Sequence, residues 1–185
     1  EQAAEAGAGS VLLLPPNAYR ADEPAVRAHY AEVALTPALL ASLYADGSIV
    51  AVKEFSGDVR RAYEIAELAP ELDLLIGADD VLLELAVAGA VGWIAGYPNA
   101  FPASCAELYH AAVTGDLDTA VPLYKSLHSL LRWDSKTEFV QSIKLSMDIA
   151  GRQGGPTRPP RHPLTGAIEA GVRTATEKAV ADGHR

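Results

Sequence analysis

The chain has one cysteine, few aromatic residues (6%) and more acidic than basic side chains. A single cysteine, Cys105, cannot form an internal disulfide, which is typical of a reducing compartment, and we predict a cytoplasmic location. The formal net charge of −9 disfavours nucleic acid or an anionic membrane as a partner, because both attract basic proteins. This balance favours a small-molecule partner.

Long hydrophobic runs are also absent. The longest candidate, residues 81–97, is interrupted by Glu84 and by glycines, and falls short of the roughly 18–20 apolar residues that cross a membrane. The amino terminus does not resemble a signal peptide and has the pattern of the last turns of a helix. We therefore expect no membrane partner and a chain that begins within its fold.

Signatures of metal and nucleotide sites are missing as well. Gly89, Gly92 and Gly96 do not have the spacing of a dinucleotide-binding motif, and Cys105 has no companion for zinc. The histidines likewise lack metal-ligand spacing: His29, His110, His128, His162 and His184. We predict no metal and no cofactor.

Short apolar runs alternate with helical patterns in the first part of the chain. Strands are predicted at residues 10–14, 49–53, 72–76 and 92–95. Helices are predicted at residues 24–34, 37–44, 59–68 and 81–88, with Pro24 and Pro37 in first turns and Asp58 and Asp80 as N-caps. This alternation predicts an α/β fold with a parallel sheet. The helices at 24–34 and 37–44 have no strand between them, which indicates an omitted segment between Ala34 and Leu35.

The second part of the chain is predicted to be helical. Helical patterns cover residues 104–114, 117–132, 137–150 and 165–181, and no strand pattern occurs among them. Residues 151–163 are rich in glycine and proline, which indicates a solvated connector. We predict an α/β part at residues 1–103 and a helical part at residues 104–185.

Lys53 ends the apolar run at residues 49–53 and is followed by a turn-rich exit. Because side chains alternate along a strand, Lys53 shares a face with Ile49 and Ala51. If that face is buried, the neutral amine is favoured, and a neutral amine can attack a ketone to form a Schiff base. The alternative is a strand-end lysine that extends into solvent.

Residues 48–58, followed by the Gly77 to Asp80 turn and the glycine-bearing residues 88–99, resemble the dihydrodipicolinate synthase / N-acetylneuraminate lyase family. The resemblance implies a (β/α)₈ TIM barrel followed by a carboxy-terminal helical domain. Such a barrel needs about 250 residues. The chain therefore resembles a partial barrel over residues 1–103, with strands that match the fourth, sixth, seventh and eighth.

The same resemblance implies a site. Lys53 matches the lysine that forms a Schiff base with pyruvate or another 2-oxo acid, and Gly77, Ala78 and Ile94 match positions near the bound acid. Tyr19 lies one residue beyond the family's tyrosine position, which Ala18 occupies. The fifth strand, which carries a proton-relaying tyrosine in the family, has no match here. Asp79 has two open interpretations, an N-cap of the helix at 81–88 and a substrate-side carboxylate.

The resemblance implies a lyase that cleaves or condenses carbon–carbon bonds through Lys53, assembled as a homodimer or homotetramer. A dehydratase or deaminase acting on a keto-deoxy sugar acid or a hydroxyproline-derived substrate is the first alternative. A catalytically silent, truncated scaffold is the second, because the tyrosine-bearing strand is missing.

Overall fold

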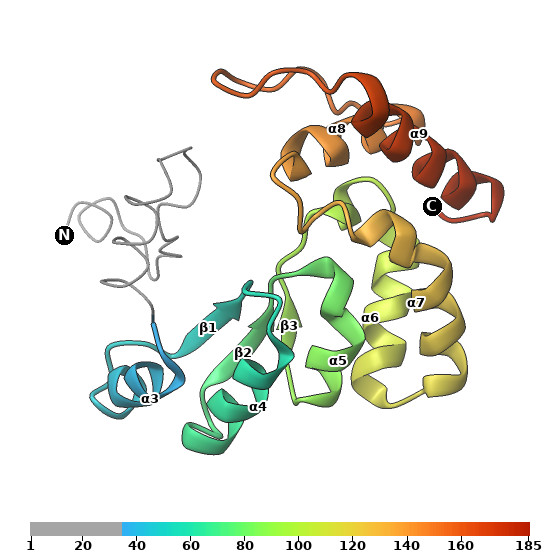
Figure 1. Ribbon diagram of the computed structural model, residues 1–185. Helices are drawn as coiled ribbons and strands as arrows, with labels where there is room; N and C mark the ends of the chain where they lie inside the picture. Colours follow the sequence, from blue (N-terminus) through green and yellow to red (C-terminus); the bar gives the residue numbers. More distant parts are fainter. Residues whose placement is uncertain (1–34) are drawn as a thin grey trace. The chain divides into compact units, whose positions relative to one another are not determined.

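The computed structural model describes residues 35–185 (Figure 1). The predicted strand at 10–14, the predicted helix at 24–34 and the proposed omission after Ala34 lie outside these residues. The described elements are, in order, α3 (Pro37–Ala45), β1 (Ala51–Glu54), α4 (Val59–Leu68), β2 (Asp73–Ile76), the 3₁₀ helix η1 (Asp79–Val81), α5 (Leu82–Val87), β3 (Gly92–Trp93), the 3₁₀ helix η2 (Tyr97–Asn99), α6 (Pro102–Thr114), α7 (Leu117–Leu131), α8 (Phe139–Ile149) and α9 (Gly166–Ala181).

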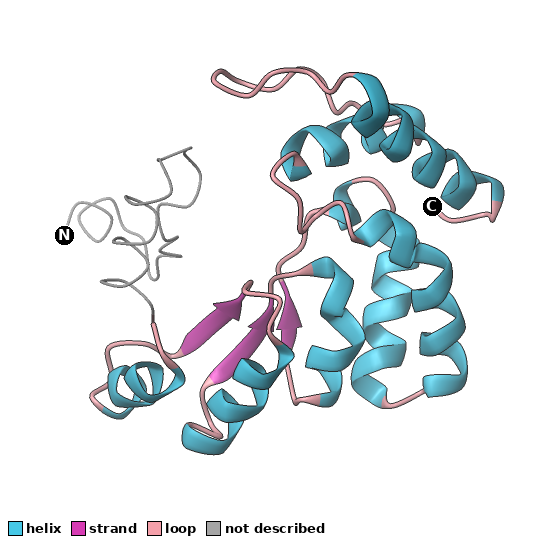
Figure 2. Cartoon of the chain, viewed as in Figure 1, coloured by secondary structure: helices cyan, strands magenta, loops and turns pink. Residues whose placement is uncertain are grey.

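The strands form a parallel sheet in the order β1-β2-β3, as the alternation of strands and helices predicted (Figure 2). Helix α4 connects β1 to β2, and α5 connects β2 to β3. The register pairs Lys53 with Leu75 and Ile76 with Trp93. Successive parallel strands joined by helices place every strand exit at the same edge of the sheet.

The predicted helix starts are confirmed in two cases and wrong in one. Helix α3 begins at Pro37, and the Asp58 carboxylate caps α4 by accepting from the backbone N–H of Arg60 at 3.1 Å. Asp80 does not cap α5, because η1 intervenes and the helix begins at Leu82 without a side-chain cap. The aspartates before this helix are engaged by tertiary contacts.

Helices α6 to α9 form the predicted helical region and pack on the sheet through α5 and α6. Residues Pro37–Arg185 form one compact unit, and the buried core runs from Ile76 and Leu82 into Leu108 and Leu127. The proposed division between residues 103 and 104 therefore crosses a continuous core, and α6 itself begins at Pro102. The division remains a proposal about family architecture.

The glycine-rich segment at residues 151–163 contains no helix or strand, as predicted. Arg152 Nε donates to the Ala100 carbonyl oxygen at 3.0 Å, which ties the segment to the end of η2. Gly154 passes so close to α8 that a Cβ atom there would lie 2.0 Å from the Lys144 carbonyl oxygen. The connector is thus held against the helical region at its start.

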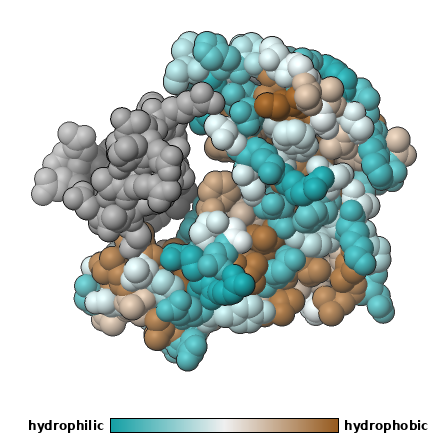
Figure 3. Space-filling model, in the orientation of Figure 1, coloured by the Kyte–Doolittle hydropathy of each residue, from teal (hydrophilic) through white to brown (hydrophobic). Residues whose placement is uncertain are grey.

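The surface of the described residues is mixed in character. Figure 3 shows hydrophobic surface over α3 at the lower left, where Leu39 is among the exposed residues. No helix within residues 35–185 has the length and hydrophobicity to span a membrane.

Leu85 and Val87 provide a matched test of the α5 contact. Leu85 is 1% exposed and Val87 is 61% exposed. We expect Leu85→Ala to lower the free energy of unfolding by about 2–5 kcal/mol, because it leaves a cavity in the shared core. Val87→Ala should change it by less than about 0.5 kcal/mol. Urea unfolding followed by circular dichroism measures both, and equal effects would contradict the packing described.

Candidate active site

The carboxyl edge of the sheet gathers most of the residues that the sequence singled out. Lys53 lies near the end of β1, Gly77 and Ala78 follow β2, and Ile94 follows β3. Tyr19, the remaining predicted substrate contact, lies outside the described residues. In parallel α/β folds this edge is where ligands bind, because strand exits and their loops converge there.

The Lys53 side chain is half-buried. Its Nζ atom lies 5.1 Å from the centroid of the Phe55 ring, within the range of a cation–π contact. The ion pairs found between residues 35 and 185 do not include Lys53. Lys53 thus has no ion-pair partner in this part of the chain, and it is less buried than the apolar strand predicted.

Glu54 is a buried charge that the sequence did not single out. Its carboxylate accepts from Arg61 Nε at 3.1 Å and from the Ser56 backbone N–H at 2.6 Å. Arg61 lies on α4, so Glu54 faces that helix and Lys53, its neighbour, faces the opposite side of the sheet. The ion pair therefore holds the Glu54 side chain on the α4 side of β1, and the alternation of side chains along the strand places Lys53 on the other side.

Gly77 lies directly beside the Lys53 side chain. A Cβ atom at position 77 would lie 2.4 Å from the Glu54 carbonyl oxygen and 2.9 Å from Lys53 Cε. The Gly77 N–H also donates to that Glu54 oxygen at 2.8 Å. Any other residue would displace the strand or the lysine, so glycine is required by packing at this position.

Ala78 and Ile94 differ in their exposure. Ala78 is fully buried beneath the edge, whereas Ile94 is 39% exposed. The Ile94 N–H donates to the Ile76 carbonyl oxygen at 2.9 Å, which extends the pairing of β2 and β3 to the site. Gly77 and Ile94 therefore approach the edge from neighbouring strands.

Asp79 does not form the N-cap contact that was one of its two open interpretations, because neither η1 nor α5 has a side-chain cap. Its carboxylate is 0% exposed and accepts from Trp93 Nε1 at 3.0 Å and from the Tyr97 backbone N–H at 3.0 Å. These bonds connect the exit of β2 to β3 and to η2. Sequence spacing could not reveal them, because the three residues meet only when β2 and β3 pair.

Asp134 lies in the connection between α7 and α8, and its side chain contacts the Asp79 backbone at the exit of β2. Its Oδ2 accepts from the Asp79 backbone N–H at 3.3 Å. A Cβ atom on Gly96 would lie 2.8 Å from Asp134 Oδ1, so Gly96 leaves the space that this carboxyl occupies. No signal in the sequence distinguished Asp134 from an ordinary loop aspartate.

Burial changes the acidity of both carboxyl groups. Desolvation and the nearby charge of Asp134 raise the pKa of Asp79 to about 8, despite its hydrogen bonds from Tyr97 and Trp93. Desolvation raises the pKa of Asp134 to about 6, opposed by the hydrogen bond from Asp79 and the charge of Lys53. Perturbed carboxyl groups beside a lysine are typical of functional sites.

Asp80 points away from Asp79 and attaches the helical region to η1. Its carboxylate accepts from Ser135 Oγ at 2.5 Å, and its carbonyl oxygen accepts from the Tyr124 hydroxyl at 2.5 Å. His128 Nε2 lies 3.2 Å from the same carbonyl oxygen. Helix α7 is thereby bonded to the exit of β2, which positions Asp134 over the edge.

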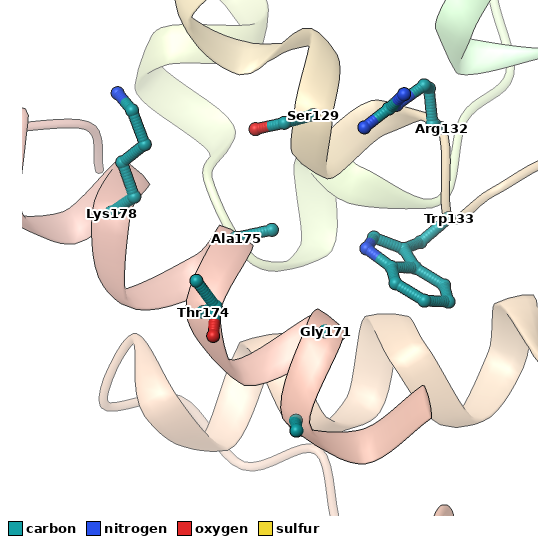
Figure 4. Close-up of a pocket in the computed structure, with 8 residues that line it drawn as sticks. Ser129, Arg132, Trp133, Gly171, Thr174, Ala175 and Lys178 are labelled. Atoms are coloured by element: carbon teal, nitrogen blue, oxygen red, sulfur yellow. The ribbon is translucent and has the colours of Figure 1, made fainter. Parts of the chain in front are cut away.

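A groove of about 500 Å³ lies elsewhere, between the end of α7 and α9 (Figure 4). Trp133 and Arg132 line one side, and Gly171 lets α9 approach the Trp133 ring. None of the predicted site residues lines this groove. Between residues 35 and 185, no group of three or more histidine, cysteine or acidic side chains is arranged to hold a metal.

The architecture defines the class of protein: an α/β chain with a parallel sheet, a lysine at the carboxyl edge and a helical region packed beside it. The chain belongs to the dihydrodipicolinate synthetase family, whose model matches residues 31–179. It thus has the α/β fold of a TIM-barrel family of lyases.

Two relatives show how far the similarity extends. The 4-hydroxy-tetrahydrodipicolinate synthase of Methanothrix thermoacetophila is 28% identical over 197 residues, covering 95% of this chain and 67% of that protein. The synthase of Methanospirillum hungatei is 28% identical over 178 residues, covering 85% of this chain and 61% of that protein. The chain thus spans about two thirds, or less, of these relatives.

A solved structure agrees with the fold. Dihydrodipicolinate synthase from Aquifex aeolicus superposes with a TM-score of 0.71 at 26% identity, covering 79% of this chain and 50% of that chain.

Asp79 makes the stability of the protein depend on pH. Because its carboxyl pKa is raised on folding, the folded state holds a proton that the unfolded state releases. The free energy of unfolding should therefore fall as the pH rises from about 4 to about 8. We expect Asp79→Asn to flatten the fall in melting temperature between about pH 5 and about pH 8.5, because its amide does not ionise. Differential scanning fluorimetry measures this slope.

The control for this test is Asp73→Asn, since Asp73 is exposed at the start of β2. It should keep the slope of the unaltered protein. A slope in Asp79→Asn as steep as that of the control would mean that Asp79 is already ionised at neutral pH in the fold.

Proposed function

We propose that this protein is a Schiff-base-forming lyase in which Lys53 reacts with pyruvate or another 2-oxo acid. The observation that supports this most strongly is the place of Lys53. It lies at the carboxyl edge of the parallel sheet, on the face opposite α4, beside a glycine that leaves room for its side chain. The names of the relatives are consistent with this proposal.

The chemistry requires an amine and a ketone. The neutral Lys53 nitrogen adds to the ketone carbon and passes one of its protons to the new carbinolamine hydroxyl. That hydroxyl takes up a further proton from solvent and leaves as water, and the nitrogen, which keeps its second proton, carries the positive charge of the iminium. In cleavage, the substrate hydroxyl two carbons from the iminium carbon loses its proton to solvent, the carbon–carbon bond between them breaks, an aldehyde leaves, and the electron pair of that bond forms the enamine. In the reverse direction the enamine supplies the pair to an aldehyde.

The remaining site residues are proposed to hold the acid. Gly77 and Ala78 would leave space at the exit of β2, and Ile94 would offer its backbone carbonyl from the exit of β3. Tyr19 is proposed as a further contact. We assign β1, β2 and β3 to the sixth, seventh and eighth barrel strands, because they pair in chain order and in parallel.

The choice between aldol chemistry and dehydration or deamination depends on the groups that meet the far end of the substrate. The edge residues described here bind the 2-oxo acid end that all these reactions share. We also propose a homodimer or homotetramer in the cytoplasm. One structural neighbour with a TM-score of 0.75 and 19% identity is described as a monomeric dihydrodipicolinate synthase variant, so assembly varies among proteins of this fold.

Trapping with borohydride tests the proposal directly. Incubation with pyruvate and sodium borohydride should reduce the iminium and add a stable adduct to Lys53, located by peptide mass spectrometry. Lys53→Met should abolish the adduct. Lys125→Met, which removes an exposed lysine on α7, should leave it unchanged.

Two results would count against the proposal. Adduct spread evenly over exposed lysines would show that Lys53 has no special reactivity. A well-folded protein that gains no mass at Lys53 would instead support the catalytically silent scaffold.

A further inference from the structure

Asp79 and Asp134 form a pair of buried carboxyl groups at the edge where Lys53 ends. They are 0% and 4% exposed, and the Asp79 N–H connects them by donating to Asp134 Oδ2. Neither carboxyl belongs to an ion pair within residues 35–185. Two negative charges this close in a buried place repel each other, so one of them retains a proton.

The charged and titratable groups around the pair come from several elements. Lys53 from β1 is the cation that acts on Asp134, and Asp80 from η1 is a further anion. Tyr97 and Cys105 lie near the pair as well: burial raises the pKa of both groups, and the charge of Asp79 raises it further. A Cβ atom on Gly77, two residues before Asp79, would lie 2.9 Å from Lys53 Cε, so the Lys53 side chain lies next to the turn that carries Asp79.

We propose that Asp134 is a positioning residue for Lys53, and that with Asp79 it keeps one proton and one negative charge beside the place where the Lys53 iminium forms. The inference rests on the proposed function. It assigns a part in the chemistry to the helical region, because Asp134 lies between α7 and α8 and not on a barrel strand.

The one negative charge that the Asp79–Asp134 pair keeps would stabilise the positive charge of the iminium. Iminium formation leaves a positive charge at the edge, and a fixed carboxylate stabilises that charge without solvent reorganisation. A second negative charge would repel the first in this buried place, and the proton on Asp79 avoids that repulsion. The Asp79 carboxyl meanwhile keeps the Trp93 and Tyr97 contacts in place.

The Trp93 indole reports on the pair without substrate, because its N–H is bonded to Asp79. The chain has 2 tryptophans, so ¹⁵N–¹H correlation spectra of the full chain contain few indole signals, and Trp133→Phe assigns them. We expect the Trp93 signal to shift between about pH 6 and about pH 8, the range in which the two carboxyl groups lose their protons as the pH rises.

Variants then show which charges act on this titration. Lys53→Met should move the midpoint of the lower-pH transition to higher pH, because the charge of Lys53 lowers the pKa of Asp134. Asp134→Asn should leave one transition at lower pH, because the charge of Asp134 raises the pKa of Asp79. The control Lys136→Met removes an exposed cation two residues from Asp134 and should change neither midpoint.

If Lys53→Met behaves like Lys136→Met, Lys53 and the pair are not coupled and the inference is overturned. This comparison leaves both carboxyls intact, so it decides the matter even if Asp134→Asn does not fold. It also needs no pyruvate, so its outcome is separate from that of borohydride trapping.

Pyruvate trapping completes the test. Asp134→Asn should raise the pyruvate concentration for half-maximal adduct by about fivefold to tenfold, because the carboxylate charge no longer stabilises the iminium. Asp134→Glu should recover part of the loss. Absence of adduct in the unaltered protein would refute the proposed function. Normal adduct formation with the same half-maximal concentration in Asp134→Asn would refute only the role of Asp134.

Discussion

The carboxyl edge of the sheet depends on the bonds that Asp79 accepts. One buried carboxyl holds the Trp93 indole and the Tyr97 backbone, so the exits of β2 and β3 keep a fixed separation. The backbone of the same residue receives Asp134 from the helical region. Sheet, exit turns and helices therefore meet at one side chain, and the candidate site lies beside it.

This arrangement costs stability. A carboxyl buried among apolar residues is favourable only when it is hydrogen-bonded or protonated, and Asp79 is both near neutral pH. An apolar residue at this position would avoid the desolvation cost but would leave the indole and backbone donors unpaired. Ionisable groups kept at such a cost are common where a protein needs a preorganised electrostatic environment.

Local features of the chain were predictable from the sequence. The span of α4 and the Asp58 cap follow from an N-capping residue ahead of a helical pattern, and both agree with the structure. The parallel sheet follows from alternation of helices with short apolar strands. The predicted Asp80 cap is wrong because Ser135, 55 residues further along the chain, binds that carboxylate. Local propensity cannot anticipate such a partner.

Residues close together in the chain were enough to predict the element order, the parallel sheet, the close approach at Gly77 and the lysine near the end of β1. The partners of Asp79, the approach of Asp134 and the burial of Glu54 against Arg61 became known only from the folded chain. Those contacts require strand pairing and helix packing, which bring together residues that carry no shared signal along the chain.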